Sequence, residues 1–318
     1  MLANGRSIFS VTKPASYKGA GFFIANVQST NGESHTGKSP KLGAAMTERE
    51  IEQSTNQESG YTLRIVELCG KYPGFRVQRL EEGVLQSQPY WYQLAFEDTL
   101  DAAREELRLI HLAGVELKSL TREYTSFGRN GPYTPDGSSA DYGYKYAEGV
   151  TKLNTPGHGF MHLDEERNQQ IHGAWRNDRG FYEEDVCWAI VAHHFPDLFT
   201  TRDRRDAKRT LMNYMPHEYM TVTGETLTLS DSMRLQEEAF VEATKDKWVS
   251  TSATQASDGM VRVTATLGGN RVPHRGSQKE RVFLVPAADY DQRTRFGLII
   301  DPASYPEILP NRPVFAAA

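Results

Sequence analysis

The chain has 318 residues, a formal net charge of −5 and a pI near 6.0. With 38% hydrophobic and 24% charged residues, it is typical of neither a membrane-spanning nor a largely disordered protein. The weak negative charge provides no general attraction for phosphate, so a nucleic-acid contact requires a local basic patch. The two cysteines form no zinc or disulfide pattern. No apolar run approaches the roughly 18 residues of a membrane span. We therefore expect a cytoplasmic protein without membrane contact.

The N-terminal region is polar. Residues 1–46 are rich in Ser, Thr, Gly, Asn and Lys and predict an arm with only short strand segments. The next segment, 47–53, predicts a short helix, with Thr47 as its cap and Glu50 as the capping-box partner three residues on.

Residues 47–120 show the clearest local pattern. Apolar and polar residues alternate over 62–68 and 74–80, and an aromatic segment follows at 89–96, so that three strands are predicted. From about Asp98 to Gly114, apolar residues recur at helical spacing. The sequence therefore predicts a small antiparallel β-β-β-α unit.

A three-stranded sheet with one helix is a common nucleic-acid-binding layout, and this one resembles AP2-type and double-stranded-RNA-binding modules. The candidate reading face for nucleic acid consists of Arg64, Arg76, Arg79 and Trp91. The predicted helix carries acidic and basic residues in similar number on its surface. Plain packing of sheet on helix is therefore the alternative interpretation.

The rest of the chain predicts a mixed α/β domain, which gives an α+β fold overall. Residues 121–154 are rich in Gly and Tyr and predict a long connection. Residues 155–301 predict an α+β domain around a buried central helix, and residues 302–318 predict a Pro-rich tail.

The predicted central helix spans residues 181–195, with acids in its first turn, an apolar interior and two histidines at its end. This order follows the helix dipole, which favours acids at the N-terminus and histidines at the C-terminus. Asp185 and His194 are nine residues apart, or roughly 13 Å along a helix axis. They therefore cannot bind one metal ion through this helix alone.

A candidate catalytic site lies where the preceding loop meets the first turn of this helix. His158 stands between two glycines, where the backbone can bend closely. A pair of His158 with Glu184 or Asp185 suits general acid–base catalysis. A metal site formed by His158, His162 and Glu184 is the alternative. The sequence lacks HExxH, CxxC and G-x-S-x-G motifs, so we assign no reaction class, metal or cofactor.

Several motifs in order resemble those of one uncharacterised domain family of phage and plasmid-borne proteins. The family pattern reads approximately T-x-x-H-G-G-x-x-L, W-Y-E-E-D-x-x-W-A, F-P-x-x-F and L-x-n-w-x-P. This chain matches it with TPGHGFMHL, FYEEDVCWA, FPDLF and LMNYMP, over about residues 140–225. It departs at Phe160, where the family has a second glycine, and at Phe181, where the family has tryptophan.

The resemblance implies an accessory protein of a phage or plasmid in the host cytoplasm. We expect a counter-defence or host-takeover factor, an inhibitor that binds a host protein or defence complex, or nucleic acid. The alternative is a hydrolase or nuclease-like enzyme that uses His158 with Glu184 or Asp185. A structural component of the virion is a third hypothesis, based on the polar N-terminal arm.

Overall fold

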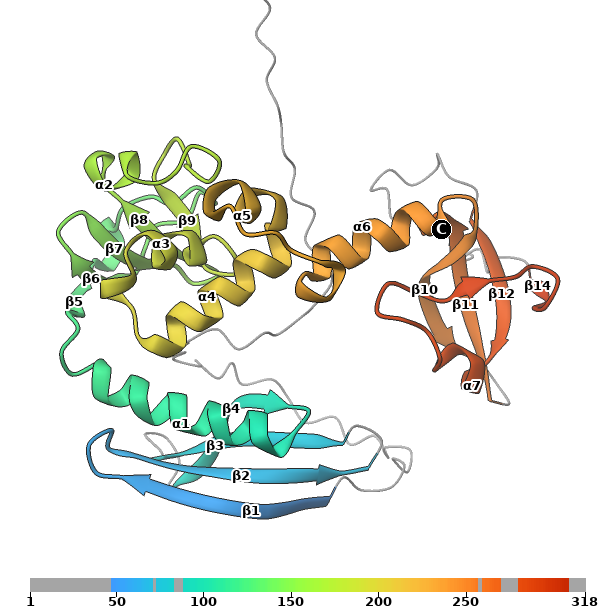
Figure 1. The fold of residues 1–318 in the computed structure, drawn as a ribbon, viewed down its shortest axis with the longest axis horizontal. Coiled ribbons are helices and arrows are strands. Elements are labelled where there is room, and N and C mark those ends of the chain that lie inside the picture. The colour runs from blue at the N-terminus through green and yellow to red at the C-terminus, as the bar shows by residue number, and fades with distance from the viewer. Residues whose placement is uncertain (1–46, 71–72, 83–87, 257–258, 270–279, 309–318) are drawn as a thin grey trace, which may run out of the picture. The chain divides into compact units, whose positions relative to one another are not determined.

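The computed structural model describes residues 47–70, 73–82, 88–256, 259–269 and 280–308 (Figure 1). The predicted arm at 1–46 lies outside these residues. The chain divides into two compact units between Lys208 and Arg209. Helices and antiparallel sheets both occur, which confirms the α+β class. The domain boundaries that we placed near residues 120 and 155 stay predictions.

The first sheet contains four antiparallel strands in sequence order. They are β1 (Thr47–Asn56), β2 (Tyr61–Cys69), β3 (Gly74–Glu81) and β4 (Tyr90–Glu97). Helix α1 (Leu100–Glu116) covers one face, and the Thr99 hydroxyl accepts its first hydrogen bond, from the Ala102 amide. The apolar side chains of the two layers form one core: Leu63, Ile65, Val77, Ala95, Ala103, Leu107 and Ile110.

The helix predicted at 47–53 is wrong, because this segment is strand β1. The sheet unit is therefore β-β-β-β-α instead of β-β-β-α. Each residue of the segment except Ile51 has a partner on β2. One such pair is ionic, because the Arg49 guanidinium lies 2.5 Å from the Glu67 carboxylate. Pairing with β2 gives nine of the ten residues of β1 a cross-strand partner, and the local capping signal does not outweigh this set of hydrogen bonds.

The second sheet has the order β5-β6-β7-β8-β9, and all neighbours are antiparallel. Its strands are β5 (Glu123–Ser126), β6 (Tyr142–Ala147), β7 (Val150–Asn154), β8 (Gly159–Leu163) and β9 (Phe181–Glu183). The predicted connection at 121–154 therefore contains three strands, β5, β6 and β7. Tyrosine and valine favour strands, and the glycines at 128, 131, 137 and 149 lie between the strands.

The predicted helix over 181–195 is too long. Residues 181–183 form β9, and helix α3 begins only at Trp188 and ends at His194. The acids therefore lie on a strand end and a turn, where the helix dipole does not act. The short helix is nevertheless the predicted buried one, because its residues 189–192 are buried and it contacts β8 and β9.

The remaining elements up to residue 223 are short helices. They are the 3-10 turns η1 (Gly128–Asn130) and η2 (Pro196–Leu198) and the helices α2 (Glu165–Gln169), α4 (Thr201–Tyr214) and α5 (Pro216–Thr223).

The C-terminal unit contains a five-stranded antiparallel sheet in the order β13-β10-β11-β12-β14. Its elements are η3 (Leu229–Asp231), α6 (Met233–Thr244), β10 (Trp248–Gln255), β11 (Met260–Leu267), β12 (Arg281–Pro286), α7 (Ala287–Tyr290), β13 (Ile299–Ile300) and β14 (Glu307–Ile308). Ser232 caps α6, because its hydroxyl accepts a hydrogen bond from the Leu235 amide at 3.3 Å. Part of the predicted Pro-rich tail forms strand β14, because its backbone pairs with β12.

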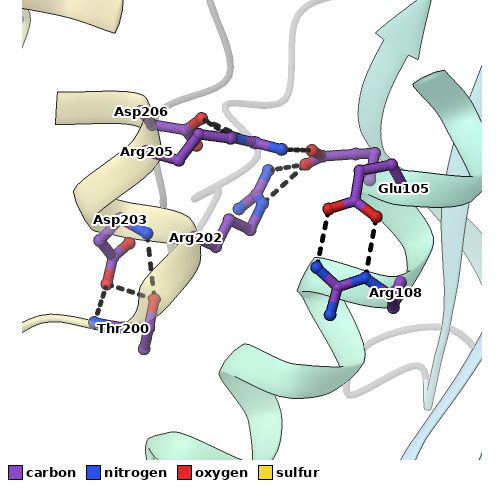
Figure 2. Close-up of polar contacts among 8 residues, drawn as sticks. Glu105, Arg108, Thr200, Arg202, Asp203, Arg205 and Asp206 are labelled. Atoms are coloured by element: carbon purple, nitrogen blue, oxygen red, sulfur yellow. Dashed lines mark hydrogen bonds and ion pairs between the residues drawn. The ribbon is translucent and has the colours of Figure 1, made fainter. Parts of the chain in front are cut away.

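An ionic cluster joins α1 to α4 within the first unit. The Glu106 carboxylate on α1 is 2% exposed and lies 2.6 Å from Arg202 and 2.7 Å from Arg205. Arg205 also pairs with Asp206 at 2.6 Å. Figure 2 shows Arg202 and Arg205 reaching from α4 toward α1, beside the Glu105–Arg108 pair on the helix surface. A buried charge in an apolar layer requires such partners.

His111 on α1 forms a second buried polar contact, which predicts a pH effect. Its Nδ1 lies 2.9 Å from the Ser59 hydroxyl, and burial lowers the pKa of the ring. Full stability is therefore expected above about pH 6.5, the ordinary histidine value. Below it, stability falls as the pH approaches the lower folded-state pKa, because the unfolded chain takes up the proton first.

Urea unfolding at pH 7 and pH 5.5 measures this effect. His111→Gln should reduce the difference between the two pH values, and the exposed His217 provides the matched control, as His217→Gln. An equal pH difference in wild type and His111→Gln would refute the assignment.

Candidate functional site

Four residues of the second sheet form a row across its strands. The register pairs Tyr142 with Asn154 and Asn154 with Gly159. The Glu184 amide then donates to the Gly159 carbonyl at 3.0 Å and extends the row beyond the end of β9. Residues in register on adjacent strands point to the same face. Asn154 and Glu184 therefore lie on one side of the sheet, with only Gly159 between them.

The turn before β8 places His158 beside this row. The His158 amide donates to the Thr155 hydroxyl at 3.0 Å, and the Thr155 amide and hydroxyl both donate to the His158 carbonyl. The imidazole Nδ1 then lies 3.8 Å from Glu183 Oε1. His158, Glu183 and Glu184 each offer a ligand atom within 4.8 Å of the others. The pairing of β8 with β9 thus brings together groups that are 25 residues apart.

Gly159 makes room for the Glu184 carboxylate. A Cβ at position 159 would overlap Glu184 Oε2 far inside van der Waals contact. The Glu184 side chain therefore lies back across the strand over Gly159, toward Asn154. Any residue with a Cβ at position 159 would displace the carboxylate, which makes this glycine a requirement of the geometry.

The imidazole and the two carboxylates are partly buried. Burial raises the pKa of Glu183 and of Glu184, and in Glu184 the charge of Lys152 partly offsets this shift. Lys152 lies on the neighbouring strand β7, and burial lowers its pKa. Asp136 is also close enough for the charge of His158 to act on it, although hydrogen bonds from Thr134 and Ser138 are the larger causes of its lowered pKa.

The structure brings together two of the three predicted catalytic residues, His158 and Glu184. The third, Asp185, has an exposed side chain outside the group, and its amide donates to Glu183 Oε2 at 2.8 Å. Sequence reasoning missed Glu183, because a helix would have directed its side chain differently. His162, the alternative metal ligand, lies outside the group, with its ring centroid 4.5 Å from that of Phe181.

The two histidines at the end of α3, His193 and His194, lie against other side chains and backbone groups of the fold. His194 Nδ1 lies 2.9 Å from the Ile190 carbonyl, and its Nε2 accepts from the His172 amide at 3.1 Å. One ring nitrogen therefore donates and the other accepts, as in a neutral imidazole. The ring centroid of Trp175 lies 5.2 Å from that of His193 and 5.7 Å from that of His194. These histidines support packing.

The predicted nucleic-acid residues of the first sheet contact acids and aromatic rings. Arg64 lies 3.2 Å from Glu50 and stacks 4.2 Å from the centre of the Trp91 ring. Arg76 lies 2.6 Å from Glu48. Arg79 pairs with Glu81 and lies on the sheet face of Leu63, opposite to Arg64. These acids offset the positive charge, and a nucleic-acid interface here stays a prediction.

Three tyrosines gather at the other end of the row. The ring centroids of Tyr124, Tyr142 and Tyr144 are 5.5 to 5.9 Å apart. Tyr124 is 59% exposed. Tyr142 is three strand spacings from Glu184, or roughly 14 Å between backbones. The cluster therefore provides one exposed aromatic ring, Tyr124, and two partly buried ones on the same sheet as the carboxylate centre.

Within the described part of the chain, no helix is long and apolar enough to cross a membrane. Comparison with curated proteins and with solved structures gave no match. One family model matches part of the chain, and it describes an uncharacterised domain, as the motifs predicted. Residues 129–245, which include the His158–Glu183–Glu184 centre, match the model of a domain of unknown function, DUF7007.

Proposed function

We propose that the protein is a nuclease-like hydrolase whose reaction centre is formed by His158, Glu183 and Glu184. The observation that carries this proposal is the convergence of an imidazole and two partly buried carboxylates within 4.8 Å. Such groups can hold a water molecule and orient it for attack on a substrate. The pair Asn154 and Lys152, on the adjacent strand, supplies donors beside it.

The tyrosine cluster favours a nucleic-acid substrate. Base stacking on exposed aromatic rings binds single strands with little sequence preference. Tyr142 lies in the same row as Glu184. When a base stacks on the cluster, the sugar–phosphate backbone of that strand could therefore follow this face of the sheet toward Glu184. A phosphodiester a few nucleotides away would then reach the centre.

Incubation of the full chain with labelled single-stranded DNA, duplex DNA and RNA tests the proposal. We expect cleavage, with single strands cut fastest. Tyr124→Ser should slow the cutting of single strands through a raised KM. Absence of cleavage of all three substrates would refute the function.

The activity should depend on Gly159. Gly159→Ala is expected to displace the Glu184 carboxylate and lower the cleavage rate by at least about tenfold, because small displacements of reacting groups are costly. Gly157→Ala is the matched control, since a Cβ there meets nothing within 4 Å. Rates are compared after circular dichroism shows that both variants are folded. Equal rates for the two variants would contradict the assigned role of Gly159.

The phage or plasmid origin of the protein also stays a proposal, supported by its sequence motifs. A nuclease-like enzyme of a mobile element would act on host or competing nucleic acid by cutting it. This differs from the predicted inhibitor, which would occupy a host protein or defence complex. Capture of a stoichiometric host protein, combined with no cleavage, would favour the inhibitor.

A further inference from the structure

We infer that His158, Glu183 and Glu184 bind one divalent transition-metal ion. Use of this ion in catalysis rests on the proposed hydrolase function, whereas binding itself can be measured without any substrate. The three residues form the one group of this kind among the residues that the structure describes. They supply one imidazole nitrogen and two carboxylate oxygens.

The distances fit a site that tightens on metal binding. Ligands at about 2.0–2.2 Å from a zinc ion are roughly 3.4 Å from one another in tetrahedral geometry. The ligand atoms here are within 4.8 Å of one another, so they must approach by at most about 1.4 Å. Rotation of the two glutamate side chains supplies this, because His158 is held by its turn while both carboxylates end flexible side chains.

The charge of the site favours a cation. Two carboxylates that converge in a partly buried site repel each other, and Glu183 and His158 are only 30% and 35% exposed. The nearby cation, Lys152, lies on the Glu184 side. A divalent ion would neutralise both carboxylates at once.

A buried amide gives the second, independent observation. Asn154 is 8% exposed, and its Nδ2 has no hydrogen-bond partner among the described residues. The register places it next to Gly159, on the face toward which Glu184 leans. A buried donor without a partner is costly, so it indicates an acceptor that is added on binding. A water or substrate oxygen bound to the metal would be that acceptor.

The ligand set selects the class of metal. Imidazole suits Zn²⁺ and other late transition metals, whereas Mg²⁺ and Ca²⁺ prefer oxygen ligands alone. One histidine with two carboxylates therefore favours Zn²⁺ or Mn²⁺ over Mg²⁺ and Ca²⁺. Three protein ligands leave a coordination position for water, as in catalytic zinc sites.

Isothermal titration of the metal-stripped full chain with Zn²⁺, Mn²⁺ and Mg²⁺ tests the inference. We expect one Zn²⁺ or Mn²⁺ per chain, and affinity at least about 100-fold weaker in His158→Ala and in Glu184→Gln, since even outer-shell changes cost 10–100-fold. His217→Ala, which removes an exposed His–Glu pair at 2.9 Å, is the matched control and should retain the affinity.

The outcomes distinguish a failure of the proposed metal site from a failure of the proposed hydrolase function. Equal Zn²⁺ affinity in wild type and both site variants would overturn the metal site. Glu184→Gln keeps the shape of the side chain, so we expect this variant to fold. Circular dichroism checks that a reduced Zn²⁺ affinity is not caused by unfolding. Cleavage that persists after chelation would also overturn the catalytic use of the ion, whereas binding without any cleavage would refute the hydrolase function alone.

Discussion

His158→Ala should lower the cleavage rate by about 10²-fold or more, because the centre loses the imidazole that would hold the metal ion. Its side chain is the only non-carboxylate member of the group of three. Glu184→Gln should show a loss of similar size, because it removes the carboxylate charge while keeping the side-chain volume. Initial rates on labelled single-stranded DNA measure both effects.

Two controls make this result specific to the centre. Asn213→Ala changes a residue of α4 outside the centre, whose side-chain amide donates to the Arg209 carbonyl at 2.9 Å and accepts from the Met233 amide at 3.0 Å. His217→Ala removes a histidine of the C-terminal unit. Both are expected to cleave at the wild-type rate. Full activity in folded His158→Ala would exclude this residue from the mechanism.

The second large effect concerns stability. Glu106→Gln is expected to destabilise the first unit by about 3–5 kcal/mol, because the buried Arg202 guanidinium loses this carboxylate. Urea unfolding followed by tryptophan fluorescence, to which Trp91 on β4 contributes, measures the change. The adjacent Glu105→Gln is the matched control. Its ion pair with Arg108 is 53% exposed on the glutamate side, so we expect a loss below about 1 kcal/mol.

The Glu106 cluster also predicts a response to acid. Burial alone would raise the pKa of Glu106, but the Arg202 and Arg205 guanidiniums outweigh burial and hold the pKa below its ordinary value of 4.5. The stabilisation is therefore present above about pH 4.5 and is lost as the pH falls through the lower folded-state pKa. Glu106→Gln should show a smaller loss of stability between pH 5 and pH 3. An unchanged acid dependence would contradict this account.

A double variant distinguishes the net contribution of the Glu106–Arg202 ion pair to stability from the cost of leaving Arg202 without its partner. Glu106→Met combined with Arg202→Met removes both charges and should recover part of the stability lost in Glu106→Gln. Replacement of a buried pair by apolar groups is often neutral, whereas removal of one partner leaves a buried charge. A double variant less stable than Glu106→Gln would show that the pair itself is strongly favourable.

Local patterns in the sequence were sufficient for several elements. The alternating residues around Leu63 and Val77 predicted strands β2 and β3, and the helical spacing before Gly114 predicted α1. The apolar run at 189–192 predicted a buried helix. These elements follow from short-range periodicity, because apolar residues must lie on one face whatever the rest of the fold.

The tertiary structure decided the elements whose partners are distant in sequence. Residues 47–53 carry a helix-capping signal, yet they form β1 because the edge of β2 supplies a longer set of hydrogen bonds. The acids at 183–185 fit a helix N-terminus, yet pairing with β8 makes residues 181–183 a strand. Strand preference depends on such partners more than helix preference does.

The candidate site shows the same division. The sequence by itself identified His158 and Glu184 and the junction where they would meet. Only the pairing of β8 with β9 placed Glu183 beside His158, excluded the exposed Asp185 and moved His162 to another part of the sheet. A strand register shifted by one residue reverses the faces of all its side chains. Which acid reaches the imidazole is therefore a property of the register, and the register is fixed by contacts across the whole sheet.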